Sequence, residues 1–256
     1  MKKVLVTGAN GQLGQCLQKI AAQFKNLEFT FKNSKDLDIT DVLSIKKSFD
    51  LVDFDYCINC AAYTDVEQAE KTPDIAFRVN AEGVKNLAFA CKKHEVGLIH
   101  ISTDYVFDGE KKEPYFIEDI PNPINEYGKS KLLGEKYIQE IMDDYCIIRT
   151  SWLYSGFGKN FYTTILNIAK VNHTLKISNT QVGYPTNALN LAKFINQLVI
   201  LANFDSNLYH FTDKVEMTWF EFAKKILKTE NLSNKVIIHN DKSTYLAARP
   251  INSRLD

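Results

Sequence analysis

The sequence has no net charge and no long apolar run. It holds 31 Lys and Arg against 31 Asp and Glu, which gives a formal charge of +0 at pH 7. Such a chain has no overall field to hold a polyanion, so we expect neither nucleic acid nor an anionic membrane as its main partner. No apolar stretch approaches the roughly 18 residues that span a bilayer, and the first apolar run, Val4 to Val6, is too short for a signal-peptide core. We therefore predict a cytoplasmic protein.

Cysteine is also scarce, and its count of five is odd. A chain of 256 residues that is 45% hydrophobic can bury a core in one or two domains without disulfides, so reduced thiols are expected. Cys57 and Cys60 form a C-x-x-C pair, which invites a metal or redox interpretation. However, their odd separation on a strand would point the two thiols to opposite faces, and no second pair supplies the four ligands that zinc requires. We predict small buried hydrophobic residues here and no catalytic metal.

Short apolar runs alternate with segments of helical periodicity along the first 150 residues. The strand-like runs cover 4–7, 27–31, 56–59, 98–102 and 146–150, and helices are expected from 12, from 41, over 76–92 and over 127–142. Strands that are apolar throughout are typical of a parallel sheet covered by helices on both faces. Residues 1–150 therefore predict an α/β fold with a Rossmann-type, doubly wound parallel sheet that binds a dinucleotide.

Beyond residue 150 this alternation loosens. Helices are expected over 161–171, over 187–202 and from a capping box at 218–221 to about 227, with strands over 175–178 and 208–212. We interpret residues 151–256 as mainly a smaller C-terminal substrate-binding lobe, with an interleaved boundary. Residues 108–125 contain Gly109 and three prolines, which predicts a flexible segment over the carboxyl edge of the sheet.

Three glycines, each three residues from the next, stand between the first strand and the first helix. Gly8 would permit a tight turn, Gly11 would let the backbone approach a pyrophosphate, and Gly14 would let the helix pack on the strand. The helix N-terminus would then face the anion. The spacing differs from G-x-G-x-x-G, so we interpret it as a variant dinucleotide loop, the alternative being a plain turn with incidental glycines. The predicted cofactor contacts in this loop are Gly8, Asn10, Gly11, Gln12, Leu13 and Gly14.

The residues after the second strand bear on the choice of cofactor. An NAD site usually has an acidic residue at this point, whereas this chain has Lys32 and Ser34 there. These side chains suit a 2′-phosphate, which predicts NADPH, with NADH also possible. The alternative is that the two lysines of this stretch, Lys32 and Lys35, are solvated surface charges. Asp38 equally fits an ordinary charge at a helix N-terminus. The remaining predicted cofactor contacts are Asp38, Ile39, Ala61, Ala62 and Tyr63.

Tyr127 and Lys131 lie four residues apart, so they share one face of a predicted helix. The Lys131 charge would lower the pKa of Tyr127, and the phenol could donate a proton to a carbonyl oxygen as hydride arrives. Thr103 follows a predicted strand at the carboxyl edge of the sheet, where its hydroxyl could orient the same carbonyl. A Tyr-x-x-x-Lys pair alone is common, but the glycine loop, the threonine and the pair in this order predict a catalytic constellation.

With these motifs the sequence resembles the extended short-chain dehydrogenase/reductases and, within them, the dTDP-4-dehydrorhamnose reductases. The segments that carry the resemblance are 6–14, 59–65, 102–109, 127–131, 134–135, 149–154, 183–186 and 248–253. They extend through nearly the whole chain, and STDYVFDG, RTSWLY and ARPINS are the most specific to the reductases. The resemblance implies reduction of dTDP-4-dehydro-L-rhamnose to dTDP-L-rhamnose, an activated sugar for cell-surface polysaccharide.

The resemblance also implies roles for individual residues. Tyr127 would be the proton donor, Lys131 would lower its pKa and hold the nicotinamide ribose, and Thr103 would position the keto oxygen. The implied substrate contacts are Thr103, Asp104, Tyr105, Trp152 and Arg249. Trp152 would pack against the sugar, although it equally fits an ordinary core aromatic. Arg249 offers a planar fork for the substrate diphosphate, with a surface ion pair as the alternative.

Other interpretations of the sequence stay open. A sugar-nucleotide epimerase or dehydratase would keep the Tyr/Lys pair, although a dehydratase usually adds acidic residues beside the threonine, and here Asp104 is followed by Tyr105. A non-catalytic regulatory subunit would bind NADP and a partner enzyme on the same fold. The chain stops at Asp256, where relatives are expected to continue into a further helix, so the member is short or truncated. A metal-bridged dimer would need a cluster of acidic residues, and the sequence near Gln15 and Asn187 has none. The oligomeric state therefore stays open between a monomer and a homodimer.

Overall fold

The computed structural model of the chain describes residues 1–201, 204, 207–234, 236–241 and 246–256. Six parallel strands form the central sheet in the order β10-β5-β4-β3-β1-β2. They are β1 (Lys2–Thr7), β2 (Leu27–Phe31), β3 (Tyr56–Asn59), β4 (Gly97–Thr103), β5 (Tyr145–Thr150) and β10 (Leu208–Phe211). The order reverses at β1, which has β2 on one side and β3 on the other. The carboxyl ends of β1 and β3 therefore border the crevice where open α/β sheets bind ligands.

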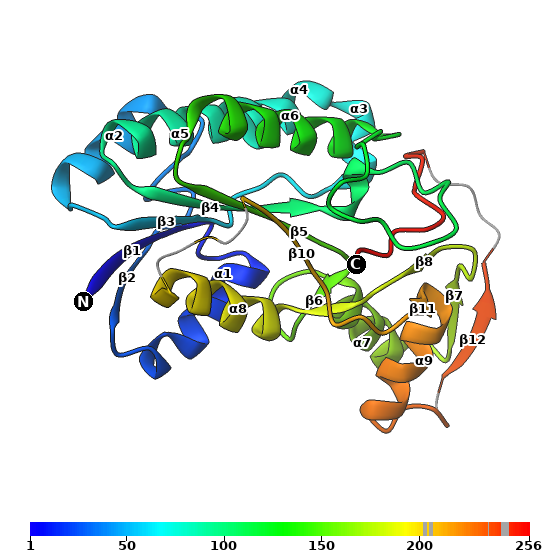
Figure 1. Cartoon of the computed structure of the whole chain (residues 1–256). Coiled ribbons are helices and arrows are strands. Elements are labelled where there is room, and N and C mark those ends of the chain that lie inside the picture. Colours follow the sequence, from blue (N-terminus) through cyan, green and yellow to red (C-terminus); the bar gives the residue numbers. More distant parts are fainter. Residues whose placement is uncertain (202–203, 205–206, 235, 242–245) are drawn as a thin grey trace.

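Helices cover both faces of this sheet (Figure 1). One face carries α2 (Val42–Leu51), α5 (Val84–Lys93) and α6 (Glu126–Ile141), and the other carries α1 (Gln12–Ile20) and α8 (Ala188–Leu201). Each face has its own apolar cluster, because successive side chains of a strand point to opposite sides. The doubly wound sheet predicted from the sequence is confirmed. The predicted last residue of the α8 helix, Ala202, lies outside the described residues.

The helix predicted over 76–92 is divided. It consists of α4 (Pro73–Phe77), a π-helical turn over Arg78–Gly83 and then α5, and it follows the short helix α3 (Val66–Lys71). Hydrophobic periodicity predicts helical backbone here but does not reveal a local change in its winding. A π-helical turn re-aims side chains within a helix and is frequent at functional sites.

Two elements beyond residue 150 extend the large sheet unit, since β10 pairs with β5 and α8 packs on α1. The others are β6 (Leu153–Tyr154), α7 (Phe161–Val171), β7 (Thr174–Ile177), β8 (Val182–Gly183), β9 (Thr186–Asn187), β11 (Met217–Thr218), α9 (Trp219–Thr229) and β12 (Ile237–Asn240). Helices α7 and α9 pack with β7 and β12 around a separate apolar cluster. Helix α9 begins at the predicted capping box, in which Thr218 and Glu221 exchange hydrogen bonds.

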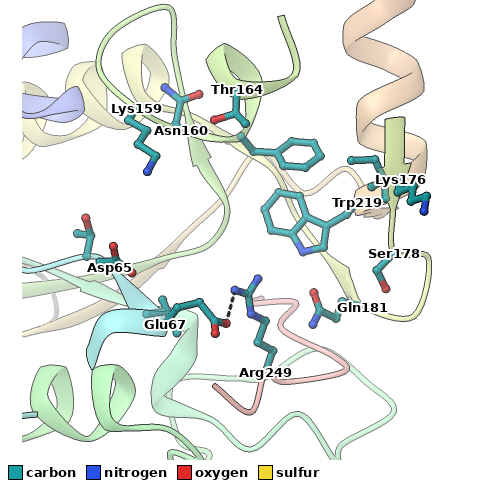
Figure 2. Close-up of a pocket in the computed structure, with 14 residues that line it drawn as sticks. Asp65, Glu67, Lys159, Asn160, Thr164, Lys176, Ser178, Gln181, Trp219 and Arg249 are labelled. Atoms are coloured by element: carbon teal, nitrogen blue, oxygen red, sulfur yellow. Dashed lines mark hydrogen bonds and ion pairs between the residues drawn. The ribbon is translucent and has the colours of Figure 1, made fainter. Parts of the chain in front are cut away.

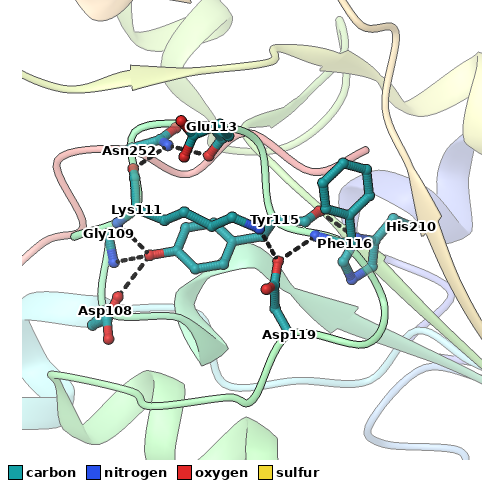
Figure 3. Close-up of polar contacts among 9 residues, drawn as sticks. All are labelled: Asp108, Gly109, Lys111, Glu113, Tyr115, Phe116, Asp119, His210 and Asn252. Carbon is teal, nitrogen blue, oxygen red and sulfur yellow. Dashed lines mark hydrogen bonds and ion pairs between the residues drawn. The ribbon is translucent and has the colours of Figure 1, made fainter.

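The segment 108–125 lies against the C-terminal residues (Figure 3). Asn252 Nδ2 donates to the backbone oxygen of Lys111 at 2.6 Å, and the Tyr115 backbone nitrogen donates to the Arg254 oxygen at 2.7 Å. These bonds satisfy backbone groups that a loose loop would leave to water. The flexible segment predicted from the glycine and prolines is therefore not what the structure shows, because distant residues at the C-terminal end hold it.

The two thiols of the C-x-x-C pair face opposite sides of the sheet, as predicted. Cys57 lies in the apolar cluster under α2 and α5, and Cys60 packs against the cluster on the α1 side. Within the described part of the chain, His, Cys, Asp and Glu side chains do not gather in threes or more that could hold a metal ion. Nor do the described residues include a helix long and apolar enough to cross a membrane.

Candidate active site

The turn between β1 and α1 brings the three glycines into close contact. Gly8 has φ +64°, and a Cβ there would lie 2.6 Å from the Ala61 backbone nitrogen at the end of β3. A Cβ on Gly14 would lie 2.6 Å from the Gly8 oxygen, so α1 packs directly on the turn. The predicted tight turn and close packing are confirmed. Gly11 is the N-cap of α1 and provides no side-chain cap, which leaves first-turn N–H groups for an anion such as a pyrophosphate.

A cavity of about 510 Å³ opens at the carboxyl edge of the sheet, beside this turn. The predicted site residues that line it are Asn10, Gly11, Gln12, Leu13, Ala62, Thr103, Asp104, Tyr105, Tyr127, Lys131 and Trp152. Parallel strands end at one edge, and α6 begins against the turn that follows β4, so residues far apart in sequence converge there. The structure thus brings together the glycine loop and the predicted catalytic residues.

Thr103 and Tyr127 lie close together in this cavity. Helix α6 begins after Asn125, whose side chain accepts a hydrogen bond from the Gly128 nitrogen at 2.7 Å. A Cβ on Gly128 would lie 2.1 Å from the Tyr105 oxygen, so this glycine permits the approach of α6 to the turn after β4. Tyr127 and Thr103 then line the same cavity, close enough for the Thr103 hydroxyl to lower the pKa of the phenol. This arrangement places the phenol and the threonine hydroxyl where one carbonyl oxygen can meet both.

Burial raises the pKa of Tyr127 to about 12, and the nearby Thr103 hydroxyl opposes this only in part. The sequence-based expectation that Lys131 lowers this pKa toward the working pH is not met, because desolvation outweighs other influences on the phenol. The phenol is therefore protonated at neutral pH. That is the form needed to donate a proton to a carbonyl oxygen.

Lys131 is buried, with 2% of its surface exposed. Its Nζ donates to the Ile101 backbone oxygen at 2.7 Å and lies 3.3 Å from His100 Nε2. Burial lowers the pKa of Lys131 to about 8, against the opposing effects of Glu135 and Cys60. Its charge state therefore changes close to neutral pH, unlike that of an exposed lysine.

A second cavity of about 570 Å³ lies beside the first (Figure 2). The two share the lining residues Thr64, Val66, Lys159, Asn160, Phe161 and Trp219. Arg249 lines the second cavity, and its Nη2 lies 2.9 Å from Glu67 Oε1, with the side chains 22% and 36% exposed. The structure thus shows the ion pair considered for Arg249 while keeping the guanidinium at the cavity wall. Lys159, Asn160 and Glu67 were not predicted from the sequence.

Comparison with known proteins identifies the family. A family model described as the RmlD substrate binding domain matches residues 1–256. The chain belongs to this family. The dTDP-4-dehydrorhamnose reductase of Aggregatibacter actinomycetemcomitans is 36% identical over 269 residues, covering 100% of this chain and 91% of the relative. The dTDP-4-keto-6-deoxy-D-glucose reductase of Streptomyces niveus is 37% identical over 221 residues, covering 86% and 76%.

A solved structure also resembles this RmlD-family chain closely. The dTDP-4-dehydrorhamnose reductase of Bacillus anthracis, crystallised in complex with NADP, superimposes with a TM-score of 0.95 at 38% identity. The match covers 100% of this chain and 91% of that one. The resemblance inferred from the sequence motifs is therefore confirmed over the whole chain.

Trp152 of this RmlD-family chain stacks on Trp219, with ring centroids 3.5 Å apart and planes 6° from parallel. Its φ of +46° is rare for a bulky residue, and a Cβ on Gly183 would lie 2.5 Å from its ring. Trp152 is 9% exposed, so it is mostly a packed aromatic, although it also lines the cavity. Trp219 was missed, because nothing in its local pattern places the start of α9 opposite Trp152.

The other predicted cofactor residues do not line either cavity. The backbone oxygen of Lys32 accepts a hydrogen bond from the glycine loop at 3.0 Å, and Ser34 is exposed. Asp38 accepts a hydrogen bond from the backbone two residues on, while Asp41 caps α2. Ile39 is 3% exposed and packs in the core. Asp41, and not Asp38, is the N-cap of α2.

Asn80 holds the end of the β3 loop and was not predicted from the sequence. Its Oδ1 accepts from the Tyr63 nitrogen at 2.8 Å, and its Nδ2 donates to the Tyr63 oxygen at 2.9 Å and to Ser130 Oγ at 3.0 Å. Asn80 therefore links the loop of residues 61–63 to α6, the helix that carries Tyr127. The one available signal was an asparagine inside a predicted helix, where it is disfavoured.

Asp104 is buried and accepts a hydrogen bond from Thr103 Oγ1 at 3.0 Å. Burial raises the pKa of Asp104 to about 7, and this effect is larger than the opposing influence of the Ser253 and Thr103 hydroxyls. A carboxyl with a raised pKa holds its proton more tightly in the folded chain than in the unfolded chain. The folded state therefore loses stability as the pH rises from about 4 through 7, and the loss is complete above that pH.

We expect Asp104→Asn to remove this penalty. At about pH 8 the variant should have a higher free energy of unfolding than the native protein, by about 2 kcal/mol or more. The gain should shrink as the pH falls toward and below 4, because the carboxyl of the unfolded chain then takes up its proton as well. Urea denaturation at several pH values measures the difference. A gain that is independent of pH, or a loss at high pH, would contradict the buried-carboxyl explanation.

Proposed function

We propose that this chain uses Thr103, Tyr127 and Lys131 to reduce the 4-keto group of dTDP-4-dehydro-L-rhamnose with NADPH, giving dTDP-L-rhamnose. The observation that carries the proposal is the convergence of the glycine loop and these three residues on one cavity. The family match and the names of its relatives support the same reaction class, an oxidoreductase acting on a nucleotide-linked keto sugar. The NADP complex of the Bacillus anthracis relative supports the cofactor.

Each residue of the site has a separate role in the proposed reduction. The tight turn at Gly8 and the uncapped start of α1 fit the pyrophosphate of a nicotinamide dinucleotide. When bound, the dinucleotide supplies hydride to the keto carbon. Thr103 orients the keto oxygen by a hydrogen bond, for which its hydroxyl proton turns from Asp104 to the substrate. The O–H bond of Tyr127 breaks as an O–H bond forms on the substrate oxygen, which leaves a phenolate. Lys131, one helical turn away, stabilises that negative charge.

The second cavity suits the nucleotide part of the substrate. Three cationic side chains line it, Lys159, Lys176 and Arg249, and they fit the charge of a diphosphate. Phe161 and Trp219 contribute aromatic faces on which a flat base can stack. The cavity shares its wall with the catalytic one, so the sugar would lie between the diphosphate and Tyr127.

NADPH oxidation by the purified chain with dTDP-4-dehydro-L-rhamnose tests the proposal. We expect turnover that needs both compounds and a product whose mass is higher by two hydrogens. Absence of turnover with intact NADPH binding would overturn the reductase assignment and favour a regulatory subunit. Tightly retained NAD without net reduction would favour an epimerase.

We expect Lys32→Ala to weaken NADPH binding by about tenfold and to leave NADH binding unchanged, because only NADPH has a 2′-phosphate for this lysine. Parallel fluorescence titrations with the two cofactors measure the effect. Lys25→Ala, an exposed lysine before β2, is the matched control and should change neither titration. Equal weakening of both cofactors in Lys32→Ala would show that Lys32 does not contact the 2′-phosphate.

A further inference from the structure

A buried chain of hydrogen bonds links the end of β1 to the catalytic lysine. Asn59 Oδ1 accepts from Thr7 Oγ1 at 2.6 Å and from the Ala61 backbone nitrogen at 3.2 Å. Asn59 Nδ2 lies 3.0 Å from His100 Nδ1, and His100 Nε2 lies 3.3 Å from Lys131 Nζ. Asn59 and His100 are almost fully buried, on the neighbouring strands β3 and β4. The mechanism above gives neither residue a role.

The Ala61–Asn59 hydrogen bond fixes which atom donates and which accepts in each of the bonds that follow. The backbone N–H of Ala61 can only donate, so the amide oxygen of Asn59 must face it and the amide NH₂ must face His100. His100 Nδ1 is then the acceptor. Burial and the nearby Lys131 lower the pKa of His100 well below its usual value, so the ring is neutral and carries one proton. That proton lies on Nε2.

The Nε2–H of His100 faces the Nζ of Lys131. An ammonium group has only donors, so it would set two donors against each other at this contact. A neutral amine has a lone pair, which can accept from Nε2–H while an N–H of the amine donates to the Ile101 oxygen. The pattern of donors and acceptors is therefore complete only when Lys131 is uncharged.

The other titratable groups that face Lys131 do not reverse this preference. The Glu135 carboxylate would favour the ammonium, but Arg149 holds it by hydrogen bonds from Nε at 3.0 Å and Nη2 at 2.7 Å. The Cys60 thiol has a strongly raised pKa because it is buried, so it carries no charge at neutral pH. The contact with His100 therefore sets the balance between the two forms of Lys131.

We propose that His100 is a positioning residue. Its fixed Nε2–H tautomer donates a hydrogen bond to the lone pair of Lys131 Nζ and so favours the neutral amine over the ammonium. In terms of the reaction proposed above, Lys131 then changes its charge readily near neutral pH. After Tyr127 has given its proton to the substrate, the Lys131 ammonium loses a proton and the phenolate regains one, which restores the phenol and leaves the neutral amine. The neutral amine is held by His100 until it takes a proton from solvent.

The tautomer can be measured without turnover. In the full-length protein labelled with ¹⁵N-histidine, we expect the His100 ring to show a protonated Nε2 and an unprotonated Nδ1 throughout neutral and mildly alkaline pH. The resonances are assigned by their loss in His100→Gln. A proton on Nδ1, or a charged ring at neutral pH, would overturn the proposal whether or not the chain proves to be a reductase.

The effect on Lys131 is measured by titrating ¹³C-labelled lysine side chains, with Lys131→Met for assignment. In His100→Gln the amide can turn its oxygen toward the ammonium, so the midpoint of the Lys131 titration should rise by about one pH unit or more. Ile99→Val is the matched control, because Ile99 is the neighbouring buried residue on β4 but packs on the other face of the sheet. A midpoint that is the same in His100→Gln and the native protein would overturn the proposal.

Asn59→Asp provides a second, nearly isosteric variant in case His100→Gln does not fold. A carboxylate cannot donate to Nδ1, so the His100 proton should move to Nδ1 and leave Nε2 as an acceptor for the ammonium. We expect the ¹⁵N spectrum to report this reversal and the alkaline limb of the pH profile of kcat/KM to move upward. An unchanged tautomer in Asn59→Asp would show that the hydrogen-bond chain does not control His100.

Discussion

Replacing Tyr127 with Phe is expected to lower kcat for keto-sugar reduction by about 10²–10⁴-fold, because the variant has no proton to give to the carbonyl oxygen. NADPH binding should stay intact, since the glycine loop is untouched and phenylalanine fills nearly the same space. The measurement is steady-state NADPH oxidation together with a direct titration of the cofactor. The pKa of about 12 adds a second expectation, that ionisation of Tyr127 itself does not limit native activity below about pH 10.

Tyr105→Phe is the matched control for this prediction. The two tyrosine rings are in edge-to-face contact, with centroids 5.7 Å apart, and both line the catalytic cavity. Removing the Tyr105 hydroxyl makes the same chemical change beside the proton path, so it should alter KM more than kcat. Equal losses of kcat in the two variants would mean that Tyr127 acts through packing, and the assignment of the proton donor would then be wrong.

The second large effect concerns stability. Arg149 and Glu135 form an ion pair with 3% and 1% of their side chains exposed, and Ser102 Oγ also donates to the Glu135 carboxylate. Arg149→Met would leave that carboxylate buried without its cation. We expect the free energy of unfolding to fall by about 3–5 kcal/mol, as is typical when one partner of a buried pair is removed. Urea denaturation measures the loss.

Two comparisons separate this explanation from general damage to the core. The double variant Arg149→Met with Glu135→Leu should recover much of the lost stability, because no buried charge remains. Lys46→Met breaks an exposed pair with Asp50 and should leave the stability almost unchanged, because water screens exposed charges. If the double variant is less stable than Arg149→Met alone, the loss comes from packing and not from the uncompensated carboxylate.

The sequence predicted features that depend on local patterns. The apolar run at Val4 to Val6 and its counterparts predicted the strands, because residues buried on both faces of a sheet must be apolar throughout. Tyr127 and Lys131 could be paired from their spacing, since residues four apart share a helix face. Gly8 could be assigned to a tight turn, because only glycine adopts its conformation without strain.

The tertiary structure decided the contacts between segments that no periodicity relates. Glu67 meets Arg249, Trp152 stacks on Trp219, and the C-terminal residues hold a loop that the sequence alone presented as flexible. Burial, which depends on the whole fold, also determined that the pKa of Tyr127 is raised although a lysine lies one turn away. The sequence by itself determined which residue types stand at the end of each strand. How those residues share protons was decided only when the fold removed them from water and set donor against acceptor.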